Sequence, residues 1–217
     1  MARAKICGIT NIPDARVAVD AGADAFGLIF ADSPRRVSIE AAREIVRAVG
    51  GTSCVPVGVF VDELPDRIVE IAERVGLRVV QLHGGESPDV VAQMRARGLD
   101  VVKSFRIATA ANLAALTRYE PTAFLLDAFV EGKAGGTGKT LDWKIARDAA
   151  PFGRIILSGG LGPDNVEAAI RIVQPYGVDA SSRLELKPGV KDPAKVREFI
   201  RLAKSSGPPT DASPWPR

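Results

Sequence analysis

The sequence predicts a (β/α)8 TIM barrel, a single α/β domain in which eight parallel strands alternate with helices. Three observations favour this fold. Short apolar runs alternate with amphipathic segments as far as about residue 203, the alternation gives eight strand-then-helix units, and the units are closely and evenly spaced without a second domain. A doubly wound open sheet is the alternative, because periodicity alone does not distinguish an open sheet from a closed one.

Each predicted strand is a short apolar run that ends at a turn signal. The first lies within Lys5–Thr10, where alternating apolar residues lead into a glycine turn and leave Cys7 at the C-terminal end of the strand. The later runs are, in order, residues 24–30, 55–61, 77–82, 100–105, 122–127, 154–157 and 177–180. Eight such runs are the number that closes a barrel of this type.

Capping residues set the limits of the predicted helices. Asn11 or Thr10 opens the first helix, and Ser38 caps the second. Glycines end the first four helices, at positions 22, 50, 76 and 98. An alanine-rich helix is expected near residues 110–118, another from about 163 to 173, and the last from 192 to about 204.

Length and composition describe one soluble domain. We expect residues 1–204 of the 217 to form the barrel, and residues 205–217, which include four prolines, to form a disordered tail. No run of 18 apolar residues and no signal peptide is visible, which predicts a cytoplasmic protein without a membrane partner. The net charge of +3 suits a small anionic substrate, whereas nucleic acid is not expected, because no basic run occurs.

The two cysteines are expected to be free thiols. Cys7 lies at the end of one predicted strand and Cys54 just before another, so parallel strands would hold them at opposite ends of a length of about 17–20 Å. A disulfide requires Cα atoms within about 7 Å. Free thiols agree with a reducing cytoplasm.

Polar residues at the C-terminal ends of the strands are the candidates for function, because the active site of such barrels is built there. Cys7 is either a reactive thiol or a small buried hydrophobe. Lys5, on the same strand face, either favours the thiolate or pairs with an interior carboxylate such as Asp179. Asp127 ends an apolar strand, where a carboxylate acts in catalysis or caps a turn.

The remaining strand ends suggest a phosphate site and a lid. Gly159 and Gly160 after the seventh strand, with Ser181 and Ser182 after the eighth, match the usual phosphate-binding position of these barrels. His83, the only histidine, is expected to line the site, and no cluster of residues has metal-ligand spacing. The loop 128–140 ends in Gly-Lys-Thr but lacks the first glycine of a P-loop, so it is either a lid or an ordinary loop.

These pieces together resemble the phosphoribosylanthranilate isomerase family of tryptophan biosynthesis. The resemblance covers residues 3–203 in order, and its motifs are residues 5–10, 24–30, 33–35, 57–61, 80–84, 125–127, 135–143, 158–166, 178–182, 188–189 and 191–192. Any single motif is weak, but the ordered set is highly specific.

The resemblance implies an Amadori rearrangement that opens a phosphoribosyl ring and moves a proton, without cofactor or metal. It implies that Cys7 is the general base, Asp127 the general acid, and Arg35 the group that binds the anthranilate carboxylate. It also implies that the 5′-phosphate binds to Gly159, Gly160, Ser181 and Ser182. The chemistry needs a thiolate and a carboxylic acid, although their ordinary pKa values, about 8.5 and 3.9, favour the opposite forms.

One position departs from the family pattern, and some alternatives stay open. Arg183 follows Ser181–Ser182 where the family usually has glycine, and its side chain either adds charge to the phosphate site or points away. Indole-glycerol-phosphate synthase would need a lysine and glutamate at strand ends, and the sugar isomerase of histidine biosynthesis an aspartate in place of Cys7. A barrel that binds a phosphorylated metabolite without turnover is a further alternative. The protein is expected to be a monomer or a homodimer.

Overall fold

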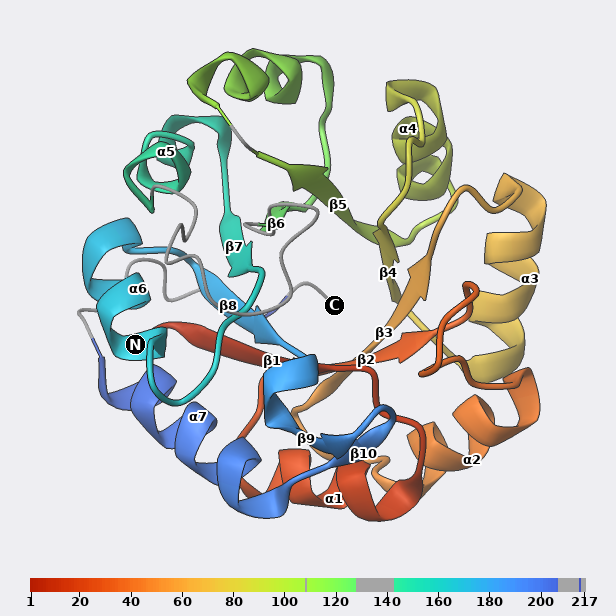
Figure 1. Ribbon diagram of the computed structural model, residues 1–217. Helices are drawn as coiled ribbons and strands as arrows, with labels where there is room; N and C mark the ends of the chain where they lie inside the picture. Colours follow the sequence, from red (N-terminus) through yellow and green to blue (C-terminus); the bar gives the residue numbers. More distant parts are fainter. Residues whose placement is uncertain (108, 128–142, 207–214, 216–217) are drawn as a thin grey trace.

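The computed structural model describes residues 1–107, 109–127, 143–206 and 215. Its parallel strands close into a barrel in sequence order, and β8 pairs with β1 (Figure 1). The strands are β1 (Arg3–Cys7), β2 (Ala25–Ile29), β3 (Val55–Phe60), β4 (Val79–Leu82), β5 (Asp100–Arg106), β6 (Ala123–Asp127), β7 (Ile155–Ser158) and β8 (Gly177–Ala180). The predicted (β/α)8 barrel is confirmed, and the open sheet is excluded.

Helical segments follow the strands and surround the barrel (Figure 1). They are α1 (Ile12–Asp20), α2 (Ile39–Ala48), α3 (Pro65–Val75), α4 (Pro88–Ala96), η1 (Ala110–Arg118), α5 (Trp143–Arg147), α6 (Val166–Val173) and α7 (Pro193–Ser205). The alanine-rich helix is present at η1 but is a 3₁₀ helix. The structure adds two 3₁₀ turns, η2 (Ala150–Phe152) and η3 (Ser182–Leu184), and a hairpin of β9 (Glu185–Lys187) with β10 (Val190–Lys191).

Capping side chains start two helices where the sequence predicts them. Asn11, rather than Thr10, caps α1, because its side chain accepts a hydrogen bond from the backbone N–H of Asp14. Ser38 caps α2 in the same way. Gly76 ends α3 with a φ of 83°, a left-handed conformation that favours glycine. These local signals set where α1 and α2 begin and where α3 ends.

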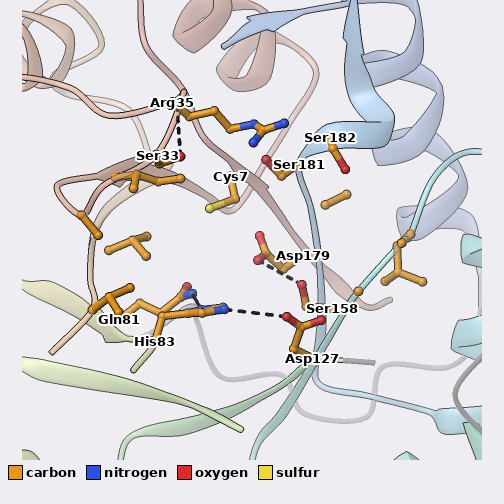
Figure 2. A pocket seen from close by; sticks show the side chains of 18 of the residues that line it. Cys7, Ser33, Arg35, Gln81, His83, Asp127, Ser158, Asp179, Ser181 and Ser182 are labelled. Atoms are coloured by element: carbon orange, nitrogen blue, oxygen red, sulfur yellow. Dashed lines mark hydrogen bonds and ion pairs between the residues drawn. The ribbon is translucent and has the colours of Figure 1, made fainter. Parts of the chain in front are cut away.

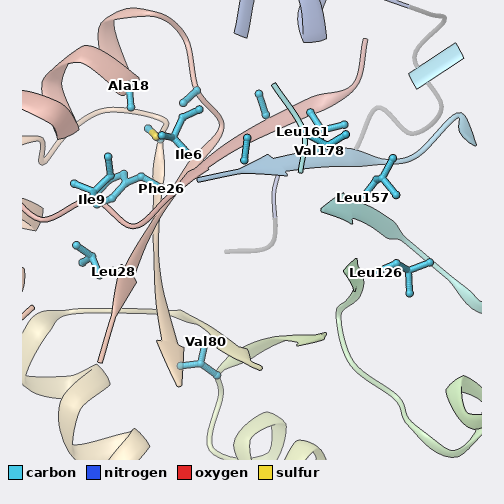
Figure 3. Packing of buried hydrophobic residues seen from close by; sticks show 14 of the residues in the cluster. Ile6, Ile9, Ala18, Phe26, Leu28, Val80, Leu126, Leu157, Leu161 and Val178 are labelled. Carbon is cyan, nitrogen blue, oxygen red and sulfur yellow. The ribbon is translucent and has the colours of Figure 1, made fainter. Parts of the chain in front are cut away.

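Two apolar clusters lie on opposite sides of the barrel wall. The larger lies between the strands and the helices and includes Ile6, Phe26 and Val80 (Figure 3). The smaller cluster comes from the other face of the strands and contains Ala25, Val57, Val79, Val102, Ala123, Leu125, Ile156, Tyr176 and Trp215. Because successive residues of a strand point to opposite faces, strands buried on both sides read as continuous apolar runs.

The same alternation gathers polar side chains inside the barrel near the C-terminal ends of the strands. Lys5 and Cys7 are two residues apart on β1 and therefore share one face. In the register of the sheet, Lys5 is opposite Asp179 of β8, and Cys7 is opposite Gly27 of β2. The barrel thus positions a thiol beside an amine and a carboxylate.

Two predicted segments fall wholly or largely outside the described residues. The loop 128–140, expected to be a lid or an ordinary loop, lies outside them, and so do residues 207–214 and 216–217 of the expected tail. The division into a domain of residues 1–204 and a disordered tail stays a prediction. Within the described ranges, no helix is both long enough and apolar enough to cross a membrane.

Trp215, near the C-terminus, is buried at the N-terminal end of the barrel. It is 3% exposed and belongs to the smaller apolar cluster. The centroid of its ring is 6.1 Å from that of Tyr176, the residue before β8. A side-chain carbon at Gly177 would come within 3.2 Å of the indole, so the ring packs closely against the start of β8.

Replacing Trp215 with alanine is expected to lower the free energy of unfolding by about 1–3 kcal/mol. Truncating a buried aromatic ring usually costs more, but part of the loss is offset, because the alanine variant no longer has to fix the rotamer of the indole side chain. Equilibrium unfolding in urea measures the change. Leu186→Ala, which truncates a side chain that is 67% exposed, is the control. An unchanged unfolding midpoint would show that the ring adds no net stability.

Candidate active site

A cavity of about 330 Å³ opens at the C-terminal ends of the strands (Figure 2). Its volume lies in the range that holds a small organic ligand. All the site residues predicted from the sequence border this one cavity: Cys7, Arg35, His83, Asp127, Gly159, Gly160, Ser181 and Ser182. The barrel therefore brings together side chains that are far apart in the chain.

Cys7 ends β1 beside a buried ion pair. The Lys5 side chain is 1% exposed, and its Nζ donates a hydrogen bond of 2.9 Å to Oδ1 of Asp179, the partner that the sequence offered as an alternative. Burial raises the pKa of the Cys7 thiol, and the nearby Lys5 ammonium opposes this rise. Cys7 and Cys54 are both free, as predicted, and the structure shows that both are buried.

Gly27 provides the space that the Cys7 sulfur occupies. A side-chain carbon built at Gly27 would lie 2.7 Å from Sγ of Cys7 and 3.3 Å from Nζ of Lys5. A carbon–sulfur separation of 2.7 Å is well inside van der Waals contact, so even a methyl group would displace the thiol. Because Gly27 has no side chain, β2 leaves the space in which the Cys7 thiol lies.

Asp127 ends β6 and faces His83, the residue that follows β4 (Figure 2). Its Oδ2 is 3.8 Å from Nε2 of His83, and the other ring nitrogen, Nδ1, is 2.7 Å from Nε2 of Gln81. The side chains of His83 and Asp127 are 28% and 19% exposed, so a ligand in the cavity can reach both. A carboxyl group at this position can exchange a proton with a bound molecule.

Arg35 comes from the loop between β2 and α2 and passes over the end of β1. Its Nε and Nη2 donate hydrogen bonds of 2.8 and 2.6 Å to the two carboxylate oxygens of Glu185. Gly8, with a φ of +77°, permits this course, because a side-chain carbon there would lie 2.6 Å from Cδ of Arg35. A guanidinium group in this position is suited to a planar carboxylate.

The loops after β7 and β8 form a further side of the cavity. Gly159 and Gly160 directly follow β7 with φ values of +93° and +64°, which suit glycine. Ser181 and Ser182 follow β8 and carry hydroxyl groups. Loops at these two positions commonly bind phosphate in barrels of this type.

Comparison with known proteins identifies the family. The profile of N-(5′-phosphoribosyl)anthranilate (PRA) isomerase matches residues 4–202. The chain belongs to this family. It is 49% identical over 207 residues to the PRA isomerase of Rubrobacter xylanophilus, which covers 94% of this chain and 100% of that relative. The corresponding protein of Pelobacter propionicus is 48% identical over 207 residues, or 95% and 97% of the two chains.

Solved structures of PRA isomerases share the fold. The enzyme from Thermotoga maritima has a TM-score of 0.86 and 40% identity, over 94% of this chain and 100% of that one. A PRA isomerase in complex with reduced 1-(o-carboxyphenylamino)-1-deoxyribulose 5-phosphate has a TM-score of 0.82 and 38% identity, with the same coverage. The family resemblance drawn from the motifs is therefore confirmed.

Arg183, at the position where the family resemblance led us to expect glycine, points away from the cavity. Its Nη2 donates hydrogen bonds of 2.8 and 2.7 Å to the two carboxylate oxygens of Asp164, and its Nη1 donates one of 3.1 Å to the carbonyl of Gly160. It does not line the cavity. Of the two alternatives for this residue, the structure supports the second, and Arg183 links the loop after β8 to the loop after β7.

Sequence reasoning did not assign several polar residues around the PRA isomerase cavity. Gln81 lines it, and the strand alternation that places His83 two residues later could have found it, whereas Asp179, which also lines it, was expected only as a partner of Lys5. Glu185 had no such signal, because it lies on a hairpin too short for periodicity. In the part of the chain that the structure describes, no group of three or more His, Cys, Asp or Glu side chains could hold a metal ion.

Proposed function

We propose that this chain is a PRA isomerase that converts N-(5-phosphoribosyl)anthranilate into 1-(2-carboxyphenylamino)-1-deoxyribulose 5-phosphate in tryptophan biosynthesis. The observation that carries the proposal is a single cavity lined by a thiol, a carboxyl group and a guanidinium group, those of Cys7, Asp127 and Arg35. Family membership over residues 4–202 supports the same reaction.

Ring opening comes first and requires an acid. Asp127 gives its proton to the furanose ring oxygen, the bond between that oxygen and C1 breaks, and the anthranilate nitrogen stabilises the resulting cation as an iminium. The Asp127 carboxylate left behind lies 3.8 Å from Nε2 of His83. A ring N–H at that nitrogen would favour the carboxylate and so assist proton release.

Proton removal follows and requires a base. The Cys7 thiolate takes the proton from C2, the electron pair of that bond neutralises the iminium, and an enolamine forms. Tautomerisation of the enolamine at C1 gives the ketone. The steps move protons between one substrate and these side chains and shift electron pairs within the substrate, so residues of the chain are sufficient and no cofactor is needed.

The two ends of the substrate are anionic and bind to different loops. Arg35 holds the anthranilate carboxylate. Gly159, Gly160, Ser181 and Ser182 hold the 5′-phosphate through backbone N–H and hydroxyl groups. His83 lines the space between the ends. Binding both anions fixes the sugar between the Cys7 thiol and the Asp127 carboxyl group.

The experiment that tests this proposal generates phosphoribosylanthranilate in situ and follows the decay of its anthranilate fluorescence. Purified protein is expected to accelerate the decay in proportion to its concentration. A correctly folded protein that leaves the fluorescence unchanged would refute isomerase activity and favour a related barrel enzyme or a binding protein. We expect the enzyme to act in the cytoplasm, as a monomer or a homodimer, without nucleic acid or membrane partners.

Gly27→Ala is expected to lower kcat by about 10-fold or more, with a smaller change in KM. The added methyl group moves the Cys7 sulfur, whereas the groups proposed to bind the carboxylate and the phosphate lie elsewhere. Steady-state kinetics separates the two constants. Gly85→Ala is the control, because its added carbon would meet its nearest neighbour, Oδ1 of Asp62, at 3.6 Å. Equal losses in both variants would contradict the positioning role of Gly27.

A further inference from the structure

The hairpin of β9 and β10 carries two buried charged side chains beside Arg35. The side chains of Glu185 and Lys191 are 3% and 0% exposed. Glu185 accepts hydrogen bonds from Nε and Nη2 of Arg35, as described above, and Oε1 of Glu185 is also 2.9 Å from Nζ of Lys191. One carboxylate is therefore shared by two cations, and the three groups form an Arg35–Glu185–Lys191 triad.

Lys191 also reaches the strand that carries Cys7. Its Nζ donates a hydrogen bond of 2.6 Å to the backbone carbonyl of Cys7 and one of 3.3 Å to that of Ser181. With the bond to Glu185, these contacts use all three protons of the ammonium group. One side chain thus connects the end of β1, the loop after β8 and the partner of Arg35.

The charges of the triad do not cancel. Burial opposes ionisation of Glu185, but Arg35 and Lys191 hold the pKa of its carboxyl group below its usual value. Two cations and one anion leave one net positive charge, and Arg35 is the member that lines the cavity. Among the described residues no hydrogen bond uses Nη1 of Arg35, so this nitrogen can donate to a ligand.

We propose that Glu185 and Lys191 are positioning residues that make Arg35 a receptor for an aromatic carboxylate. Glu185 fixes the plane of the guanidinium group by binding two of its nitrogens. Lys191 balances the charge of Glu185, so that Arg35 keeps its attraction for a second carboxylate. This inference rests on the proposed function, in which Arg35 binds the carboxylate of anthranilate.

The geometry also explains why a lysine is needed. Without Lys191, the Arg35–Glu185 pair would be neutral, and an incoming carboxylate would meet Glu185 as well as Arg35. Repulsion between the two anions would then offset the attraction of the guanidinium group. A purely structural tie between the hairpin and the barrel would not depend on the charge of the ligand, and this difference can be measured.

The test compares the binding of two inhibitors. One is reduced 1-(o-carboxyphenylamino)-1-deoxyribulose 5-phosphate, and the other is the same compound without the ring carboxylate. We expect the wild type to prefer the carboxylated inhibitor and Arg35→Ala to lose that preference. Lys191→Met should reduce the preference roughly 10-fold. Lys191→Arg, which keeps the charge, should retain more of it than Lys191→Met does.

A second variant tests geometry at constant charge. Glu185→Asp shortens the carboxylate by one methylene group, so it should also reduce the preference by moving the guanidinium plane. Neither Lys191→Met nor Glu185→Asp should change inhibitor binding further in an Arg35→Ala background, because both act through Arg35. Lys187→Met removes an exposed charge from the same hairpin and is the matched control.

Two outcomes would overturn the inference. In the first, Lys191→Met leaves the preference unchanged, as it would if it weakened both inhibitors equally. In the second, its effect persists without Arg35. Thermal unfolding shows whether each variant folds, including Lys191→Met in the Arg35→Ala background, where Glu185 loses both cations. The single substitution Lys191→Met keeps the Arg35–Glu185 pair. A wild type that turns over substrate but does not discriminate between the inhibitors would refute the carboxylate role of Arg35 itself.

Discussion

Replacing Asp127 with asparagine is expected to lower kcat/KM by about 10²–10⁴-fold. Asparagine has nearly the same shape and can still form a hydrogen bond to the ring oxygen, but it cannot transfer a proton to it. The barrier to ring opening therefore rises while substrate binding changes little. The fluorescence assay described above measures the loss, and KM should stay within a few-fold of the wild-type value.

The control for Asp127→Asn is Asp148→Asn, which makes the same chemical change on an exposed side chain after α5. Asp148→Asn should retain the wild-type rate. Near-wild-type turnover by a folded Asp127→Asn enzyme would show that another group donates the proton. His83 would then be the first candidate, since its Nε2 faces the same position in the cavity.

The overall fold could be predicted because its signals are repeated along the chain. Each apolar run ends before a turn or a capping residue, and the runs at 100–105 and 177–180 lie within a residue of β5 and β8. The 3₁₀ character of η1 could not be predicted. Composition does not distinguish hydrogen bonds between residues i and i+3 from those between i and i+4.

The candidate site could be predicted only in part, for a geometrical reason. A residue at the C-terminal end of a strand is visible in the sequence, so Cys7 and Asp127 could be found from their positions alone. The contacts of Arg183 and Arg35 depend on side chains 19 and 150 positions away, Asp164 and Glu185. No local pattern encodes such pairings, because the closed barrel brings those loops together.

Cys7→Ala is expected to cause the second large loss, again about 10²–10⁴-fold in kcat/KM. The alanine methyl group fits the space beside Gly27 but cannot accept the C2 proton. Cys54→Ala is the matched control, because Cys54 is likewise buried and free, but it precedes β3 at the opposite end of the barrel. Equal activity in the two variants would remove Cys7 from the role of base.

The pH dependence of the variants identifies which group each has lost. Burial raises the pKa of the Cys7 thiol, so below that pKa the thiolate is a minor form whose fraction rises tenfold per pH unit. Without Asp127, any residual reaction depends on that thiolate, so the residual kcat/KM of Asp127→Asn should rise about tenfold per pH unit between pH 7 and about 8.

Cys7→Ala has no thiolate to gain as the pH rises, so its residual kcat/KM should not show this increase. Parallel profiles for the two variants would contradict the assignment of Cys7 as the base. A rise in Asp127→Asn that is absent from Cys7→Ala would establish that the thiolate, although a minor form, carries the reaction.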